Sequence, residues 1–152
     1  MTENRVEDSV LIAAPVHLTW DITNALEGWT GLFSECAKVE VLERDGETVR
    51  FRFTTHPHPD GAVHSWVATR TADVPAGVVV ERRENTGPFA YMDITWTYVA
   101  EGDGTRLGWS QAFAIKAGVP HSVEGAAKAL GARMSTELAH IKQHVEDAAR
   151  SA

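Results

Sequence analysis

The stretch PHSVEGAAKALGARMSTELAHIKQHVEDAA, residues 120–149, is the only segment of the chain long enough to form one long helix. Apolar residues recur within it at three- and four-residue steps, the period of one helical face: Leu130, Met134, Leu138, Ile141 and Val145. Proline is tolerated at the start of a helix, so we expect the helix to begin near Pro120, with Ser122 as a weak candidate cap. Thirty residues at the helical rise span about 45 Å, more than the width of a small domain.

Most of the chain before this helix has the pattern of β-strands. A sheet that curls around one long helix buries the apolar face of each element, so we expect an α+β fold of the helix-grip type. At 152 residues, the chain is expected to be a single domain spanning residues 1–152.

Composition excludes several classes of function. The formal net charge is −7, and no basic stripe is present that would neutralise the phosphates of a nucleic acid. No apolar run approaches the ~18 residues that span a bilayer, and the N-terminal residues lack the core of a signal peptide. A single cysteine, Cys36, fits a reducing compartment, so we expect a cytoplasmic protein without membrane or nucleic-acid partners.

Turn signals divide the chain into about seven antiparallel strands. The first strand is expected over Val6–Ala13, followed by a short helix that Pro15 opens and a second helical piece over Leu26–Phe33. Asp45-Gly46 marks a tight hairpin. The expected strands after the first are Lys38–Arg44, Glu47–Thr55, Ala62–Thr71, Gly77–Glu84, Phe89–Ala100 and Thr105–Ile115.

Alternation along three of these strands, taken as neighbours, places tryptophans and apolar residues on one face. Two of the faces also carry a polar group, Arg70 beside Trp66 and Gln111 beside Trp109. An ordinary core would reject such groups, because burying them without partners costs several kcal/mol. The pattern therefore predicts a roomy ligand cavity between the sheet and the long helix.

Arg70 is the first candidate for chemistry. A guanidinium in an apolar cavity keeps its charge and would stabilise an enolate that develops on a substrate carbonyl. The alternative is an arginine that reaches solvent or pairs with a glutamate at a strand end. The same-face neighbours Trp66 and Ala68 leave the two interpretations evenly balanced.

Glu137 and Gln111 are weaker candidates. Glu137 falls in the apolar stripe of the long helix and could move protons if it is buried. A flank position fits the spacing equally well, and a solvated glutamate is the expected case. Gln111 could donate a hydrogen bond to a substrate oxygen, or it could bond the backbone at a strand end.

The sequence gives little support for metal, nucleophile or nucleotide chemistry. His56, His58 and His64 lie in or next to a proline-rich loop, and the cysteine that could complete a zinc site is elsewhere, so no metal is expected. No nucleophile-elbow motif surrounds a serine, and no glycine-rich phosphate loop precedes a helix.

Specific runs of residues carry a resemblance to a known family. These are Ile12-Ala13-Ala14-Pro15-Val16, Trp20-Asp21-Ile22-Thr23-Asn24, Trp29, Leu32-Phe33-Ser34-Glu35 and Glu84-Asn85-Thr86-Gly87-Pro88-Phe89-Ala90-Tyr91-Met92 leading to Trp96. The chain resembles the single-domain aromatase/cyclases of bacterial aromatic polyketide pathways, such as the tetracenomycin and spore-pigment cyclases, within the START/Bet v 1-like superfamily. The likeness is dense from about Val10 to Ile115 and looser in the final helix.

The resemblance implies a function and a set of site residues. It implies first-ring aldol cyclisation and dehydrative aromatisation of a linear poly-β-ketone held by the acyl carrier protein of a type II polyketide synthase, without a cofactor. It implies catalytic roles for Arg70 and Gln111, to which Glu137 is added. The substrate-binding residues that it implies are Trp29, Phe33, Cys36, Trp66, Ala68, Phe89, Met92, Trp96, Trp109 and Met134.

Three departures from the family pattern affect the mechanism. Ala68 stands where relatives carry a serine, Cys36 where they carry a tyrosine, and Glu137 where an asparagine is frequent. A serine or tyrosine hydroxyl at those positions therefore cannot donate the dehydration proton here. We expect Arg70 with ordered water, helped by Glu137, to take that role.

Other functions remain open at this point. The same fold could serve as a non-catalytic binder of hydrophobic molecules, as a chaperone of the polyketide or as an interaction module. A carrier protein is acidic, so docking would need a local basic patch, for which the candidates are Arg50, Arg52, Arg82, Arg83 and Arg106. Chain length, ketoreduction state, ring regiochemistry and oligomeric state are not encoded in a recognisable pattern.

Overall fold

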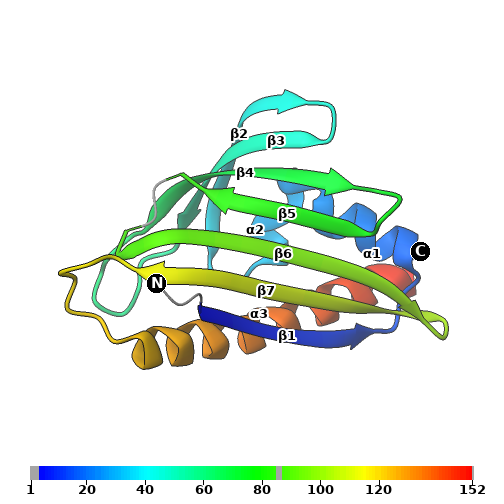
Figure 1. Ribbon diagram of the computed structural model, residues 1–152. Coiled ribbons are helices and arrows are strands. Elements are labelled where there is room, and N and C mark those ends of the chain that lie inside the picture. Colours follow the sequence, from blue (N-terminus) through cyan, green and yellow to red (C-terminus); the bar gives the residue numbers. More distant parts are fainter. Residues whose placement is uncertain (1–3, 85–86, 152) are drawn as a thin grey trace.

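The computed structural model describes residues 4–84 and 87–151. Seven strands form one antiparallel sheet in the order β1-β7-β6-β5-β4-β3-β2, and the long helix α3 runs along β1 behind the sheet (Figure 1). The strands are β1 (Asn4–Ile12), β2 (Cys36–Asp45), β3 (Thr48–Thr55), β4 (Ser65–Asp73), β5 (Val78–Arg83), β6 (Phe89–Glu101) and β7 (Gly104–Ile115). The helices are α1 (Val16–Asn24), the 3-10 turn η1 (Leu26–Gly28), α2 (Trp29–Leu32) and α3 (Val123–Ser151).

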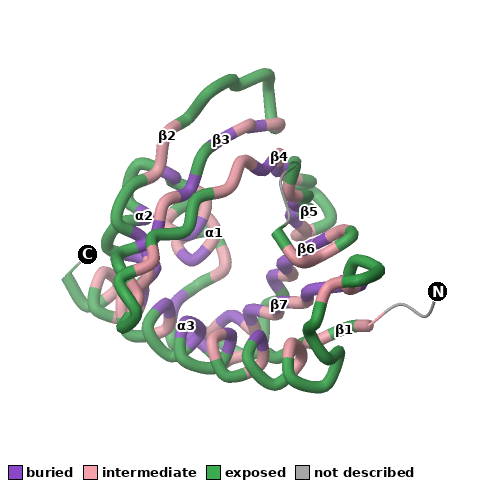
Figure 2. The backbone as a smooth tube through the Cα atoms, turned by 90° about the vertical axis from the view of Figure 1, so that its left-hand side faces the viewer, coloured by how far each residue is buried: buried purple, intermediate pink, exposed green. Residues whose placement is uncertain are grey.

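The helix-grip architecture expected from the sequence is confirmed. Figure 2 shows the sheet curving around α3, with α1 and α2 closing the same side. The two short helices lie between β1 and β2 as expected. The interior that they enclose is therefore formed by one face of the sheet and by all three helices.

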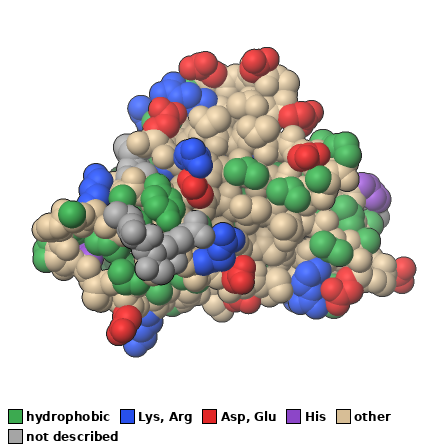
Figure 3. All heavy atoms as spheres, in the orientation of Figure 1, with side chains coloured by type: hydrophobic (Ala, Val, Ile, Leu, Met, Phe, Trp, Pro, Cys, Tyr) green, Lys and Arg blue, Asp and Glu red, His purple; other side chains and the backbone are tan. Residues whose placement is uncertain are grey.

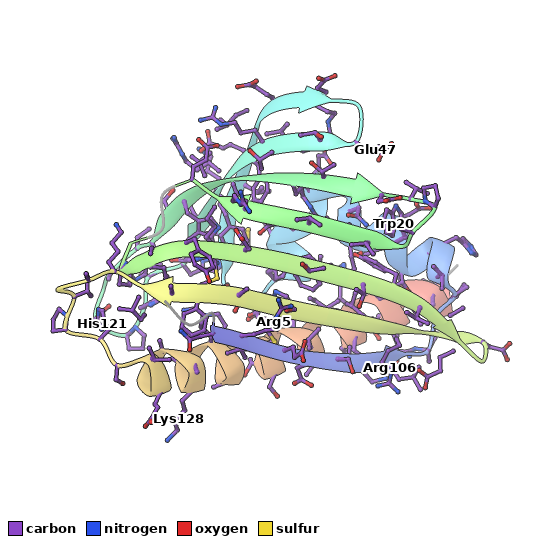
Figure 4. The ribbon with its side chains drawn as sticks, in the orientation of Figure 1. Arg5, Trp20, Glu47, Arg106, His121 and Lys128 are labelled. Carbon is purple, nitrogen blue, oxygen red and sulfur yellow. The ribbon has the colours of Figure 1, made fainter. Side chains whose placement is uncertain are left out.

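The helix α3 begins three residues after Pro120. The Ser122 hydroxyl accepts a hydrogen bond from the backbone N–H of Gly125 at 2.9 Å, so Ser122 does cap the helix. The apolar stripe is buried against the sheet, with Met134 and Ile141 fully inaccessible. Lys128 points away from the sheet (Figure 4), as the opposite face of an amphipathic helix requires. Among the described residues, no helix is both long and apolar enough to cross a membrane.

The expected hairpins are present, with two differences. Gly46 adopts a positive φ of 59° in the β2–β3 turn, a conformation that glycine reaches without steric cost. Strand β4 begins at Ser65 instead of Ala62, because the proline-containing loop extends to His64. The three tryptophan-bearing strands are also not all neighbours, because β5 lies between β4 and β6.

Candidate active site

Arg70 lies inside the molecule. It projects from β4 with 3% of its surface exposed, and its guanidinium carbon lies 4.9 Å from the centre of the Trp29 ring. Its Nε atom is 3.9 Å from a carboxyl oxygen of Glu81, an ion pair too long to be a hydrogen bond. Within the described part of the chain, Arg70 Nε and Nη1 have no hydrogen-bond partner. The alternative of an arginine that reaches solvent is therefore wrong, whereas the alternative of a pairing with a glutamate is met by the long ion pair with Glu81.

Strand β5 adds two charged residues that sequence reasoning did not place in the interior. Glu81 pairs directly with Arg70 across the β4–β5 ladder, and Arg83 lies two residues further along the same face. The Arg83 guanidinium carbon is 4.0 Å from the centre of the Trp66 ring, which favours its charge. Burial raises the pKa of Glu81 despite the nearby arginines, and burial lowers the pKa of Arg83 to about 10.

Aromatic rings fill the space around these charges. Trp96 and Trp109 stack with their centroids 4.4 Å apart, and Phe33 meets both rings edge-on. Trp29 also packs edge-on against Phe33. The Trp109 indole N–H is buried and, among the described residues, has no acceptor. The sheet and α2 thus form an aromatic interior that contains unpartnered donors.

The described residues do not enclose the roomy cavity that the sequence predicts in the interior. Two small cavities of about 10 and 30 Å³ remain in the interior, and Trp29, Phe33 and Trp96 line both. Arg70 lines the smaller cavity, while Glu81 and Arg83 line the larger one with Trp66 and Trp109. Sites for ligands of moderate size occupy roughly 300–1,000 Å³. The aromatic side chains must therefore move apart before a ligand of moderate size can enter.

The other residues proposed for the site fall into two groups. Cys36, Ala68, Met92, Gln111 and Met134 are buried in the surrounding core and do not line either cavity. Burial raises the pKa of the Cys36 thiol to about 11, so it remains protonated at neutral pH. Phe89 lies outside the interior, in the wall of the openings described below.

Glu137 is buried, contrary to the expectation that it is solvated. Its two carboxylate oxygens accept hydrogen bonds from the Ser34 backbone N–H, at 2.9 Å, and from the Ser34 hydroxyl. These bonds join α3 to the segment between α2 and β2. The carboxylate does not line either interior cavity, so the structure does not bring it together with Arg70.

Two hollows of about 330 and 360 Å³ form a mouth at one end of the sheet. Both are lined by Arg83, Pro88, Phe89 and Arg133, and one extends to His121, which is labelled at the left in Figure 4. Arg83 and Trp66 line both the mouth and the larger interior cavity. Their contact therefore separates the mouth from the aromatic interior.

Glu35 bridges the mouth and the interior. It lines the larger cavity, and its carboxylate lies 3.5 Å from Arg133 Nε on α3. Burial raises the pKa of Glu35, while Arg133 opposes that rise. Charges of alternating sign thus follow one another from Arg70 through Glu81, Arg83 and Glu35 to the mouth.

Two of the three histidines in and beside the proline-rich loop meet at the mouth. The His58 and His64 rings lie 4.6 Å apart, whereas His56 is exposed. Within residues 4–84 and 87–151, no group of three or more His, Cys, Asp or Glu side chains could hold a metal ion.

The basic patch considered for carrier docking is not a single surface. Arg82 and Arg83 are neighbours in sequence, but Arg82 is exposed and pairs with Asp93 while Arg83 faces the interior. Arg50 and Arg106 also pair with carboxylates, Glu84 and Glu101. Basic and acidic side chains are mixed over the outer face of the sheet (Figure 3), which agrees with these pairs.

Comparison with known proteins identifies the family of the chain. Residues 3–146 match the family described as "Polyketide cyclase / dehydrase and lipid transport". A Streptomyces cyaneus protein named "Putative polyketide cyclase" is 47% identical over 141 residues, which cover 93% of each chain. The actinorhodin polyketide synthase bifunctional cyclase/dehydratase of Streptomyces coelicolor is 33% identical over 91% of this chain and 43% of its own length.

A solved structure supports the fold. The Zhui aromatase/cyclase from Streptomyces sp. R1128 superposes with a TM-score of 0.81 at 22% identity, covering 95% of this chain and 94% of its own. The resemblance noted in the sequence is thereby confirmed. The chain belongs to the polyketide cyclase/dehydrase and lipid transport family.

Proposed function

We propose that this protein is an aromatase/cyclase that directs first-ring aldol closure and dehydrative aromatisation of a poly-β-ketone held on an acyl carrier protein. The observation that carries the proposal is the set of buried, unpartnered polar atoms in the described residues. All four are N–H donors: Arg70 Nε and Nη1, Arg83 Nε and Trp109 Nε1. Buried donors normally have acceptors, and a chain of ketones supplies an acceptor at every second carbon.

The chemistry requires orientation and charge stabilisation. A methylene between two carbonyls is already acidic, so the protein has to hold the folded chain and stabilise the enolate oxygen. Arg70 carries a permanent charge in an aromatic interior, where an interaction with an anion is stronger than in water. We assign Arg70 to the enolate, with no cofactor in the cycle. Gln111 is buried two residues along β7 from Trp109, and we assign it to the orientation of a substrate carbonyl once the interior has opened.

Aromatic walls determine how the chain can fold. Trp29, Phe33, Trp66, Trp96 and Trp109 contact the interior cavities, so a ligand that opens them is placed between flat, rigid rings. The residues behind these rings are Cys36, Ala68, Met92 and Met134. Phe89 contacts the polyketide at the mouth. A tethered substrate enters there, past Arg83 and Trp66, because these two residues line both the mouth and the interior.

A non-catalytic binder or chaperone of polyketides is the second candidate. The small interior volume and the absence of hydroxyls at Ala68 and Cys36 favour it. A binder protects its ligand without changing which ring forms. An enzyme changes the product.

The test is reconstitution with a minimal polyketide synthase, with and without this protein, and identification of the first ring by mass spectrometry and NMR. The proposal predicts that a single regiochemistry replaces the spontaneous mixture. The same mixture in both reactions would exclude a cyclase, and slower spontaneous cyclisation without a new product would indicate the binder.

A further inference from the structure

Glu81 is buried in the interior, but the proposed function gives it no role. It lies on the inner face of β5 with 7% of its surface exposed, and it lines the larger interior cavity together with Trp96 and Trp109. It is the direct cross-strand neighbour of Arg70. A carboxyl group thus stands at the cavity wall beside the guanidinium assigned to the enolate.

Among the described residues, none donates a hydrogen bond to the Glu81 carboxyl within ordinary distance. Its ion pair with Arg70 is 3.9 Å long, which gives electrostatic attraction without a hydrogen bond that would occupy an oxygen. Arg83 attracts it from the same strand. The other titratable groups around it are Tyr98 on β6 and Glu35 at the cavity wall, with Glu137 and Arg133 of α3 beyond Glu35.

The remaining proton carriers near the interior are less suitable. The Cys36 thiol is fully buried and titrates at about 11, too high for a base at neutral pH. Glu137 uses both oxygens on Ser34, and the Tyr98 hydroxyl is 2.6 Å from Thr23 Oγ1. Glu35 also lines the larger cavity, but its ion pair is with Arg133 of α3 and not with Arg70.

We propose that Glu81 is the catalytic acid–base that moves protons in the aldol and dehydration steps. The proposal rests on the proposed function, because it names the residue that handles the protons of that reaction. The Glu81 carboxylate removes a proton from a methylene between two carbonyls, and Arg70 stabilises the enolate oxygen. The enolate carbon then forms a bond to a ketone carbon, whose oxygen becomes an alkoxide and receives the proton from Glu81.

Dehydration repeats the same exchange. Glu81 removes the next α-proton and returns it to the hydroxyl group, which leaves as water when its carbon–oxygen bond breaks. Tautomerisation of the remaining ketones then gives the aromatic ring. Each cycle releases one water and returns Glu81 to its starting state, so no oxidant or reductant is needed. Burial supports this role because it raises the pKa of Glu81 toward the pH at which acid–base catalysts work best.

The test compares Glu81→Gln, Glu81→Asp and wild type in the reconstituted synthase, by initial rate of directed product from pH 5 to 9. Glu101→Gln is the matched control, because Glu101 is exposed, pairs with Arg106 and lines neither interior cavity. The expected loss for Glu81→Gln is at least about 100-fold at constant thermal stability. Wild type gains activity as pH rises through the Glu81 pKa, which lies above 4.5, and this rise disappears in Glu81→Gln.

The outcomes separate this inference from the proposed function. If wild type gives the spontaneous mixture, the proposed function fails first. If wild type directs the product and Glu81→Gln keeps the wild-type rate, or keeps the rise of activity with pH, Glu81 is not the acid–base. If Glu81→Gln does not fold, Glu81→Asp decides, because withdrawing the carboxyl by one methylene costs at least about ten-fold in rate for a catalytic group. An unchanged rate in Glu81→Asp overturns the proposal.

Discussion

Polar groups next to α1 are paired, whereas some donors on the central strands have no partner among the described residues, although Thr23, Tyr98 and Arg70 line the same small cavity. Near α1, Thr23 Oγ1 donates to the Thr19 carbonyl at 2.7 Å and lies 2.6 Å from the Tyr98 hydroxyl. In the centre, Arg70 and Trp109 carry donors that no described residue satisfies. The same chain is therefore able to pair its buried polar groups. Unpaired donors in the centre indicate a place where a ligand supplies the acceptors.

The largest expected effect comes from removing the charge at the centre. Arg70→Met should reduce directed ring closure roughly 100- to 1,000-fold, because the enolate loses its main electrostatic partner. The free energy of unfolding should also fall, because the buried Glu81 carboxyl loses the guanidinium that faces it at 3.9 Å.

Arg70→Lys is the matched control for that variant. It keeps the charge but loses the planar fork, so it should recover part of the activity. The measurements are product analysis in the reconstituted synthase and urea unfolding. Full activity in folded Arg70→Met would contradict the conclusion that the unpaired donors of Arg70 mark the ligand site.

A second prediction concerns the link between α3 and Ser34. Glu137→Ala should lower the free energy of unfolding by about 1–3 kcal/mol, because the Ser34 N–H and hydroxyl lose their acceptor. Glu137→Gln retains one acceptor oxygen, so its free energy of unfolding should fall by less. Urea titrations of both variants measure the difference.

Product analysis of Glu137→Gln then separates structure from chemistry. Directed product should persist in the folded protein, because the carboxylate is engaged by Ser34 and does not line the interior cavities. Loss of directed product at unchanged stability would show that Glu137 takes part in catalysis.

Thr23 on α1 should affect stability without affecting the product, although it lines the same small cavity as Arg70. Thr23→Val removes a hydroxyl bonded to both the Thr19 carbonyl and Tyr98, so stability should fall by about 1 kcal/mol. The regiochemistry of the product should stay the same. Thermal unfolding and product analysis test the two halves of this prediction, and a changed ring pattern would mean that Thr23 also shapes the substrate.

The smallest effect is expected on the outer face of β5. Arg82→Met should leave both thermal stability and turnover unchanged, because its pair with Asp93 is exposed to solvent. Its neighbour Arg83 faces the interior, so Arg83→Met should reduce directed product about ten-fold. Equal effects of the two substitutions on carrier-bound substrate would instead support a docking patch.

The sequence was sufficient to predict most of the fold because its signals are local. The helical period from Leu130 to Val145 and the Asp45-Gly46 turn depend on residues close in the chain. The face of β5 could not be assigned in that way. Val78, Val79 and Val80 are apolar on both sides, so alternation does not show that Glu81 and Arg83 point inward.

The site was only partly predictable for a related reason. Arg70 and the tryptophans share strand faces, and periodicity identifies such faces. The closed interior depends instead on how the rings pack, such as the stacking of Trp96 on Trp109. The partner of Glu137 is Ser34, 103 positions away, which no local pattern reveals.

The central claim is that the unpartnered donors hold the carbonyl oxygens of a polyketide. The most direct measurement is a crystal structure with a linear, non-reactive polyketide mimic that keeps the acceptor oxygens. The account predicts mimic oxygens about 3 Å from nitrogen atoms of Arg70 and Trp109, with Trp29, Phe33 and Trp96 moved apart. A mimic bound only at the mouth or on the outer face, with the interior still closed and those donors unpaired, would contradict it.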